Sequence, residues 1–150
     1  MIVEIEWNEP LALRSLSEKD VKRIRARLKN GPGIYVFARR WGSDFEALYV
    51  GQASKLLGRV TTQFNNRKLI EHVMSARIGA KVLLTGYLVY NGTTNIKKSL
   101  NTAERAYIRY CIAQGHSLHN KQGTRLRTNE VLSVGRHGNT TFPKKIEVGV

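Results

Sequence analysis

The chain has 150 residues, of which 41% are hydrophobic, and this is enough to build one ordinary hydrophobic core. It contains 25 Lys and Arg residues against 11 Asp and Glu, giving a formal net charge of +14 at pH 7. Such an imbalance is typical of proteins that bind a polyanion, and nucleic acid is the first candidate. The single cysteine, Cys111, excludes an intramolecular disulfide and a cysteine-rich zinc site, and we expect it to be a small core residue.

No apolar leader or membrane-spanning run is visible in the sequence. The basic first helix also lacks the stripe of Trp, Phe and Leu that would hold it at a membrane surface. We therefore expect a cytoplasmic protein with no membrane partner.

The first thirty residues predict an extended segment and a helix. Residues 1–12 alternate weakly between apolar and polar, which indicates a strand or an extended arm. Ser17 followed by Asp20 is typical of a helix start, and apolar residues then recur at helical spacing. The sequence Asn30-Gly31-Pro32 ends this helix.

Two short apolar runs, Gly33–Ala38 and Phe45–Val50, have the length and the β-branched and aromatic content of strands. The polar and glycine-containing residues between them predict an antiparallel hairpin with a longer loop. Adjacent strands would bring Tyr35 and Tyr49 within reach of one another.

Further segments complete the predicted fold. Ser54 is positioned to cap a helix with Leu57, Val60 and Phe64 as its apolar stripe. The later segments are a helix at Arg67–Ile78, a strand at Val82–Tyr90 and a helix at Asn101–Gln114, and beyond Thr124 no structure is assigned. The expected fold class is α+β, with a small central antiparallel three-stranded β-sheet flanked by α-helices. We expect one domain over residues 1–150, with its core at about 31–120 and the basic first helix and C-terminal tail as additions.

Two charged residues stand out as candidates for chemistry. Arg59 projects from a different face of its helix than the apolar stripe, close to the end of the second strand. Glu104 is the only acidic residue between Glu71 and Glu130, and Ile108 lies on its side of the helix, so we expect a half-buried carboxylate. The alternative is structural: behind an Asn101 cap, Glu104 would be the third helical residue and could bond back to the cap.

In this order, the tyrosines, the glycine, the arginine, the glutamate and a later asparagine resemble the core of the GIY-YIG nuclease family. The matching residues are Tyr35, Tyr49, Gly51, Arg59, Glu104 and Asn120. The resemblance covers roughly residues 31–120, and five elements in the right order are far more specific than any one tripeptide. Where many members of the family have a tyrosine or histidine, four residues after the arginine, this chain has Gln63, whose amide cannot take a proton near neutral pH.

The resemblance implies a metal-dependent DNA endonuclease. It implies one Mg²⁺ ion, for which Mn²⁺ can substitute, held by Glu104, together with Arg59 on the phosphate oxygens. One of the two tyrosines would act as the base, a role that requires nearby positive charge such as Arg59 or Lys55, and the choice between them stays open with Tyr49 slightly preferred. Asn120 would orient the phosphate or the tyrosine hydroxyl.

The remaining candidates are contacts and supports. Gln52 and Lys55, beside the second strand, and Arg125 and Arg127, in the tail, are expected to bind DNA. Gly51 and His72 are candidate supports of the site. His116 and His119 have the spacing of a metal pair, but no ligand cluster of the usual zinc pattern accompanies them.

Two other functions remain open. One is a non-catalytic nucleic-acid-binding module of the same fold, with RNA as a possible ligand. The other is a nuclease toxin, which alone would need an immunity protein as partner. A homodimer is compatible with the sequence but not required by it.

Overall fold

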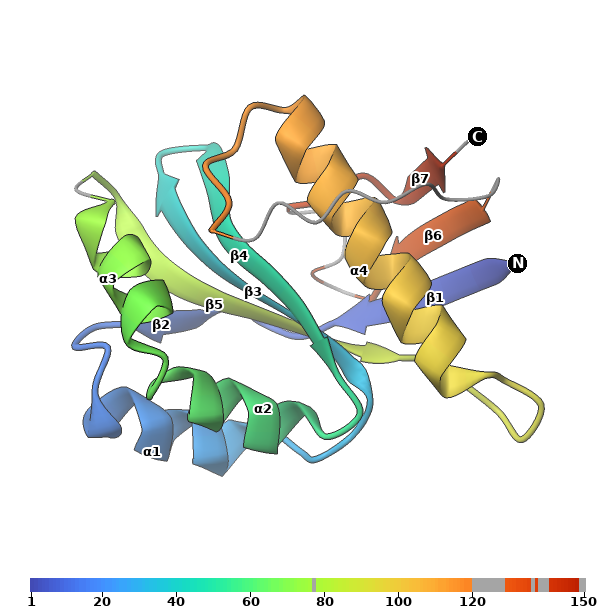
Figure 1. Ribbon diagram of the computed structural model, residues 1–150, viewed down its shortest axis with the longest axis horizontal. Coiled ribbons are helices and arrows are strands. Elements are labelled where there is room, and N and C mark those ends of the chain that lie inside the picture. The colour runs from blue at the N-terminus through green and yellow to red at the C-terminus, as the bar shows by residue number, and fades with distance from the viewer. Residues whose placement is uncertain (77, 120–128, 136, 138–140, 149–150) are drawn as a thin grey trace.

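The computed structural model describes residues 1–76, 78–119, 129–135, 137 and 141–148 (Figure 1). In these ranges it contains four helices and seven strands, in the order β1 (Ile2–Trp7), β2 (Leu11–Leu13), α1 (Glu18–Arg27), β3 (Gly33–Trp41), β4 (Asp44–Ala53), α2 (Leu56–Gln63), α3 (Arg67–Ser75), β5 (Ala80–Leu88), α4 (Ile96–Ala113), β6 (Asn129–Val134) and β7 (Lys145–Val148). The predicted α+β class is confirmed. Of the two alternatives for residues 1–12, the strand is present, as β1 and β2.

The sheet is larger than the sequence predicted. The strand order is β4-β3-β5-β1-β6-β7, and β2 also pairs with β5. The three predicted strands are adjacent and antiparallel, so they form the β4-β3-β5 part of the sheet. The prediction of a three-stranded antiparallel sheet is nevertheless wrong, because four more strands join and β1 pairs with β6 in parallel.

The β3–β4 hairpin contains a bulge that places two neighbouring residues on the same side. Phe37 pairs with Tyr49 but Ala38 pairs with Ala47, so Leu48 is the extra residue on β4. Leu48 and Tyr49 consequently both pack in the cluster formed with α1, α2 and α3, whereas Ala47 packs in the cluster formed with α4. Tyr49 shares the face of Tyr35 through the regular register, since it lies two residues from Gly51, the partner of Tyr35, and the bulge adds Leu48 to this face.

Helices cover the sheet on two sides. Helix α4 crosses one face, while α1, α2 and α3 lie against the other (Figure 1). The α4 side buries Ile34 and Val36 of β3, and the opposite side buries Tyr35 and Phe37 of the same strand. Successive residues of a strand point to opposite faces, so β3 contributes to both cores and is central to the fold.

Two helices begin at asparagine caps. The Asn95 side chain accepts a hydrogen bond from the Lys98 amide at the start of α4, and Asn66 accepts one from Leu69 at the start of α3. Asn101, predicted to be the cap, lies inside α4, more than one turn beyond Asn95. The apolar spacing fits a helix that starts after either asparagine, so the spacing alone does not distinguish Asn95 from Asn101.

Two other predicted helix boundaries differ. Helix α3 ends at Ser75 rather than Ile78, and Lys55 rather than Ser54 occupies the N-cap position of α2. Helix α1 begins after Ser17 as predicted, although the Ser17 side chain makes no capping bond. Asp20 of α1 instead accepts hydrogen bonds from the amides of residues 14–16.

None of the helices in the described ranges is long and apolar enough to cross a membrane.

Candidate active site

A cleft of about 490 Å³ opens beside the C-terminal end of β4. The predicted site residues that line it are Tyr35, Tyr49, Gln52, Arg59 and Glu104. They come from β3, β4, α2 and α4, elements widely separated in the sequence. The fold thus brings together most of the residues that the sequence singled out.

The edge position of β4 explains how these residues meet. Glu104 belongs to α4 on one face of the sheet, and Arg59 belongs to α2 on the other. Because β4 is the last strand on that side, no further strand separates the two helices there. The outward backbone N–H of Gln52 donates a hydrogen bond to Glu104, so the unpaired strand edge helps to position the carboxylate.

The two tyrosines form a stacked pair. Their ring centroids are 5.8 Å apart with an interplanar angle of 22°. Gln63 donates its side-chain amide to the Tyr35 hydroxyl at 2.7 Å and to the Tyr49 hydroxyl at 3.4 Å. Asn66 donates in turn to the Gln63 carbonyl oxygen at 3.2 Å, which fixes the direction of the amide.

Tyr35 is almost completely buried, with 1% of its surface exposed. Burial raises the pKa of Tyr35 well above its ordinary value; the hydrogen bond from Gln63 opposes the rise, and the neighbouring Tyr49, to which its hydroxyl is hydrogen-bonded, adds to it. Tyr35 is therefore protonated at neutral pH. The Tyr35 hydroxyl thus keeps its hydrogen beside the Tyr49 oxygen, which accepts from Gln63.

Gly51 is required by the position of Tyr35. The two residues are direct partners in the β3–β4 register. A β-carbon at Gly51 would overlap the ring and hydroxyl of Tyr35. The glycine of the Tyr-Val-Gly run thus allows the tyrosine to lie flat across the strand.

Glu104 is partly buried at the α4 side of the cleft. Desolvation raises its pKa above the ordinary value, and the Gln52 backbone hydrogen bond together with the charges of Arg105 and Arg59 partly offsets the rise. The capping role expected as the alternative is wrong, because Asn95 caps α4 and Glu104 lies well inside the helix.

Positive charge surrounds this single carboxylate. Arg59 is exposed on α2, and Lys97 of α4 lines the cleft as well. Lys97, Leu100 and Glu104 follow at helical spacing, so the sequence would have revealed Lys97 had the start of α4 been placed correctly. Lys55 lies at the N-cap of α2, next to the cleft residue Ser54, but is not itself among the lining residues.

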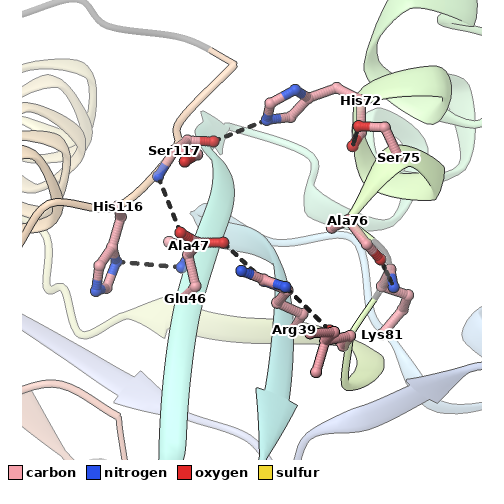
Figure 2. Close-up of polar contacts among 10 residues, drawn as sticks. Arg39, Glu46, Ala47, His72, Ser75, Ala76, Lys81, His116 and Ser117 are labelled. Carbon is pink, nitrogen blue, oxygen red and sulfur yellow. Dashed lines mark hydrogen bonds and ion pairs between the residues drawn. The ribbon is translucent and has the colours of Figure 1, made fainter.

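The histidines occupy two different environments. His116 accepts a hydrogen bond from the Ala47 amide through Nδ1 at 3.1 Å, and its ring packs edge-on against Phe45. His72 contacts the Ser117 carbonyl oxygen through Nε2 at 2.7 Å, as Figure 2 shows. His119 is turned the other way, against His72 and Tyr49. His116 and His119 therefore do not form a metal pair.

His119 is a neighbour of the site that sequence reasoning did not select. Its ring centroid lies 6.1 Å from that of Tyr49 and 5.4 Å from that of His72. Desolvation, and then the charges of His72 and Lys68, lower the pKa of His119. His72 does not line the cleft and reaches Tyr49 only through His119.

Asn120, Arg125 and Arg127 lie outside the described residues, so their predicted roles stay predictions. Within the described ranges, no group of three or more His, Cys, Asp or Glu side chains could hold a metal ion. The donor set of the cleft is one carboxylate, Glu104. This fits Mg²⁺, which is commonly held by one or two carboxylates, water and substrate phosphate, and it does not fit a zinc site closed by protein ligands.

The chain was compared with protein-family models, with curated proteins and with solved structures, and none of the three comparisons gave a match.

Proposed function

We propose that this protein is a metal-dependent endonuclease of the GIY-YIG type that hydrolyses DNA phosphodiester bonds. The observation that carries the proposal is the cleft in which Tyr49, Arg59 and Glu104 meet from three different elements. The adjacent, antiparallel β4, β3 and β5 would be the three-stranded core of such a fold. The net charge of +14 suits a polyanionic substrate.

The tyrosine pair suggests which hydroxyl accepts the proton of the attacking water. Tyr49 accepts a hydrogen bond from Gln63, and the protonated Tyr35 hydroxyl lies beside it as a second donor that would stabilise negative charge on its oxygen. Tyr35 is buried and stays protonated, so it serves as a donor and not as the base. In this proposal Tyr49 is the general base and Gln63 orients both hydroxyls.

Two charged residues would act on the phosphate. The guanidinium of Arg59 suits the nonbridging oxygens and stabilises the charge that accumulates on them in the transition state. Glu104 would hold the Mg²⁺ ion, which, when bound, supplies Lewis-acid stabilisation of the leaving oxygen. Because the carboxylate has a raised pKa and lacks a second acidic ligand, we expect weak metal binding until substrate phosphate contributes oxygens.

A non-catalytic nucleic-acid-binding module of the same fold is the second candidate. The isolation of Glu104 favours it, because one carboxylate with a raised pKa is a poor metal site without substrate. The arrangement of the cleft favours the nuclease, since binding to phosphate alone would not need a carboxylate beside Arg59. A nuclease toxin would share the site and differ only in its biological setting.

The test is cleavage of supercoiled, linear and single-stranded DNA by the purified chain, with Mg²⁺ and with a chelator. Glu104→Ala and Arg59→Ala should each lower the cleavage rate by at least about 10²-fold, as for other residues that stabilise transition-state charge. Glu71→Ala and Arg67→Ala are matched controls, because these residues pair with each other on the exposed surface of α3. DNA binding without metal-dependent cutting by the wild type would reject the nuclease and favour the binding module.

A further inference from the structure

A second hollow with cationic and aromatic walls lies apart from the cleft. It is a groove of about 470 Å³. Arg27, the last residue of α1, and Lys29, just after it, line one part, and Tyr87 of β5 and Tyr90, just after that strand, line another. None of the described residues that line it is acidic, and Glu6, which pairs with Tyr87 in the β1–β5 register, is not among them. We call it the Tyr90 groove.

The Tyr90 groove and the cleft flank the start of the same strand. Gly33 of β3 pairs with Ala53 on one side and with Tyr87 on the other. Ala53 lines the cleft and Tyr87 lines the Tyr90 groove. Two strand spacings separate these neighbours, which is about 10 Å. This separation is short enough for one nucleic-acid strand to contact both hollows.

The segment between the two hollows is held in place. The Leu56 amide donates to the Gly31 carbonyl oxygen at 2.9 Å, and the Gly58 amide donates to the Asn30 side chain at 2.9 Å. These bonds connect the groove-lining residues 30 and 31 to the start of α2, the helix that carries Arg59. The relative position of the groove and the cleft is therefore fixed by the fold.

The groove presents an aromatic ring for binding. Tyr87 is fixed, since its hydroxyl accepts from the Lys29 amide at 2.6 Å and donates to the Lys29 carbonyl oxygen at 3.1 Å. Tyr90 is 53% exposed, and in the described part of the chain its ring and hydroxyl have no partner. Arg27 and Lys29 are exposed and form no salt bridge with any described residue. An exposed aromatic ring beside free cations suits an unpaired nucleotide, because the ring stacks on the base and the cations contact phosphate.

We propose that the Tyr90 groove binds the single DNA strand that flanks the scissile phosphate, with one base stacked on Tyr90 and Arg27 and Lys29 on the backbone. This inference rests on the proposed function in taking DNA as the ligand. The bases of a duplex are stacked on one another and leave no free face for Tyr90. The groove therefore favours an unpaired or frayed strand next to the bond in the cleft.

The test measures binding of a single-stranded oligonucleotide and of its duplex to the full chain, in chelator so that no cutting occurs. Tyr90→Ala should weaken single-strand binding by about 5- to 150-fold, which corresponds to the loss of one stacked base. Tyr90→Phe keeps the ring and should keep the affinity. Arg27→Ala and Lys29→Ala should each lower the slope of log K against log salt by about 0.7, whereas Lys22→Ala, an exposed change on α1 outside the groove, should change it less.

A cross-linking experiment locates the base directly. Single strands with 5-iodouracil at successive positions are irradiated on the protein, and the linked peptide is identified by mass spectrometry. A link to Tyr90 from a narrow range of positions supports the proposal. Equal losses of single-strand and duplex affinity in Tyr90→Ala, or wild-type single-strand affinity in that variant, would overturn the groove proposal alone. If the wild-type chain binds no DNA, both the groove and the proposed nuclease are rejected.

Discussion

The β3–β4 hairpin has a turn, which we call the hairpin end, and an open end beside the cleft, which we call the cleft end. The two ends differ in whether their charged side chains form ion pairs. At the hairpin end, Arg39 and Glu46 form a salt bridge of 2.7 Å in which both side chains are mostly buried. Glu46 also accepts from the Ser117 amide at 3.4 Å (Figure 2). Arg39 donates to the Ile78 carbonyl oxygen at 3.2 Å and lies over the Trp41 ring. Both members of this ion pair therefore have further partners within the protein.

At the cleft end the charged side chains form no ion pair in the described part of the chain. Neither Arg59 nor Glu104 forms a salt bridge with another described residue, although both line one cleft. The neutral groups there are well connected, because the pair of tyrosines, Gln63 and Asn66 form a continuous network. We expect the ion pair at the hairpin end to contribute to stability, whereas the proposed function needs Arg59 and Glu104 at the cleft end to be available to a ligand.

The largest change in stability is expected from Gly51→Ala. The added methyl group would overlap the buried Tyr35 ring, and overpacking of this kind costs about 1–3 kcal/mol; the upper end applies because the ring has little room to move. Chemical denaturation measures the loss. Gly92→Ala is the matched control, since a β-carbon there meets no atom within 4 Å. Equal stability of the two variants would show that Tyr35 is free to move.

A second prediction concerns Gln63, which connects the two tyrosines. Gln63→Leu leaves the buried Tyr35 hydroxyl without its donor, and we expect a loss of about 1–3 kcal/mol together with a changed pH profile of cleavage. Adding Tyr35→Phe removes the other partner, so the double variant should regain part of the lost stability. Urea denaturation of the four proteins in this cycle gives the coupling energy. Additive losses would contradict a network.

The local parts of the fold were predictable from sequence because short-range patterns specify them. The strands that contain Tyr35 and Tyr49 are rich in β-branched and aromatic residues and are separated by polar residues. Arg59 follows near the start of a helix. The gathering of these residues with Glu104 agrees with the order of the motif. Gln63 was identified only as a departure from the family pattern. It lies at helical spacing from the buried Leu56 and Val60, but the sequence prediction had assigned Leu57 and Phe64 to this stripe.

The long-range parts of the sheet were not predictable in the same way. The parallel pairing of β1 with β6 joins Val3 to Val131, and no local pattern specifies a partner so distant in the chain. The Tyr90 groove was not predictable for a related reason, because only the tertiary structure brings Arg27 and Tyr90 together. Propensity identifies elements, whereas their pairing depends on burial of the whole core.

At the hairpin end, a third prediction tests the role assigned to the ion pair. A double-mutant cycle with Arg39→Met and Glu46→Gln should give a coupling of about 1 kcal/mol, above the usual value for exposed pairs because this pair is mostly buried. Thermal unfolding provides the measurement. Cleavage by the three variants should match that of the wild type under conditions where all are folded. A loss of cleavage in folded Arg39→Met or Glu46→Gln would show that this ion pair also contributes to activity, and would contradict the separate roles assigned to the two ends.

The smallest effect, with the opposite sign, is expected from Glu104→Gln. Because desolvation raises the pKa of Glu104 above its ordinary value of 4.5, the folded state binds the proton more tightly than the unfolded state does. Ionisation therefore reduces stability as pH rises from 4.5 through the folded-state pKa. The glutamine carries no charge, so the variant should unfold at a higher temperature than the wild type at pH 7, with a smaller difference at pH 4. Its carbonyl oxygen can still accept the Gln52 hydrogen bond.

Thermal unfolding at both pH values, without metal, measures the effect of Glu104→Gln. A variant less stable than the wild type at pH 7 would mean that the carboxylate stabilises the fold. A gain in stability joined to a loss of cutting would show that the unpaired charge at the cleft end is retained for function.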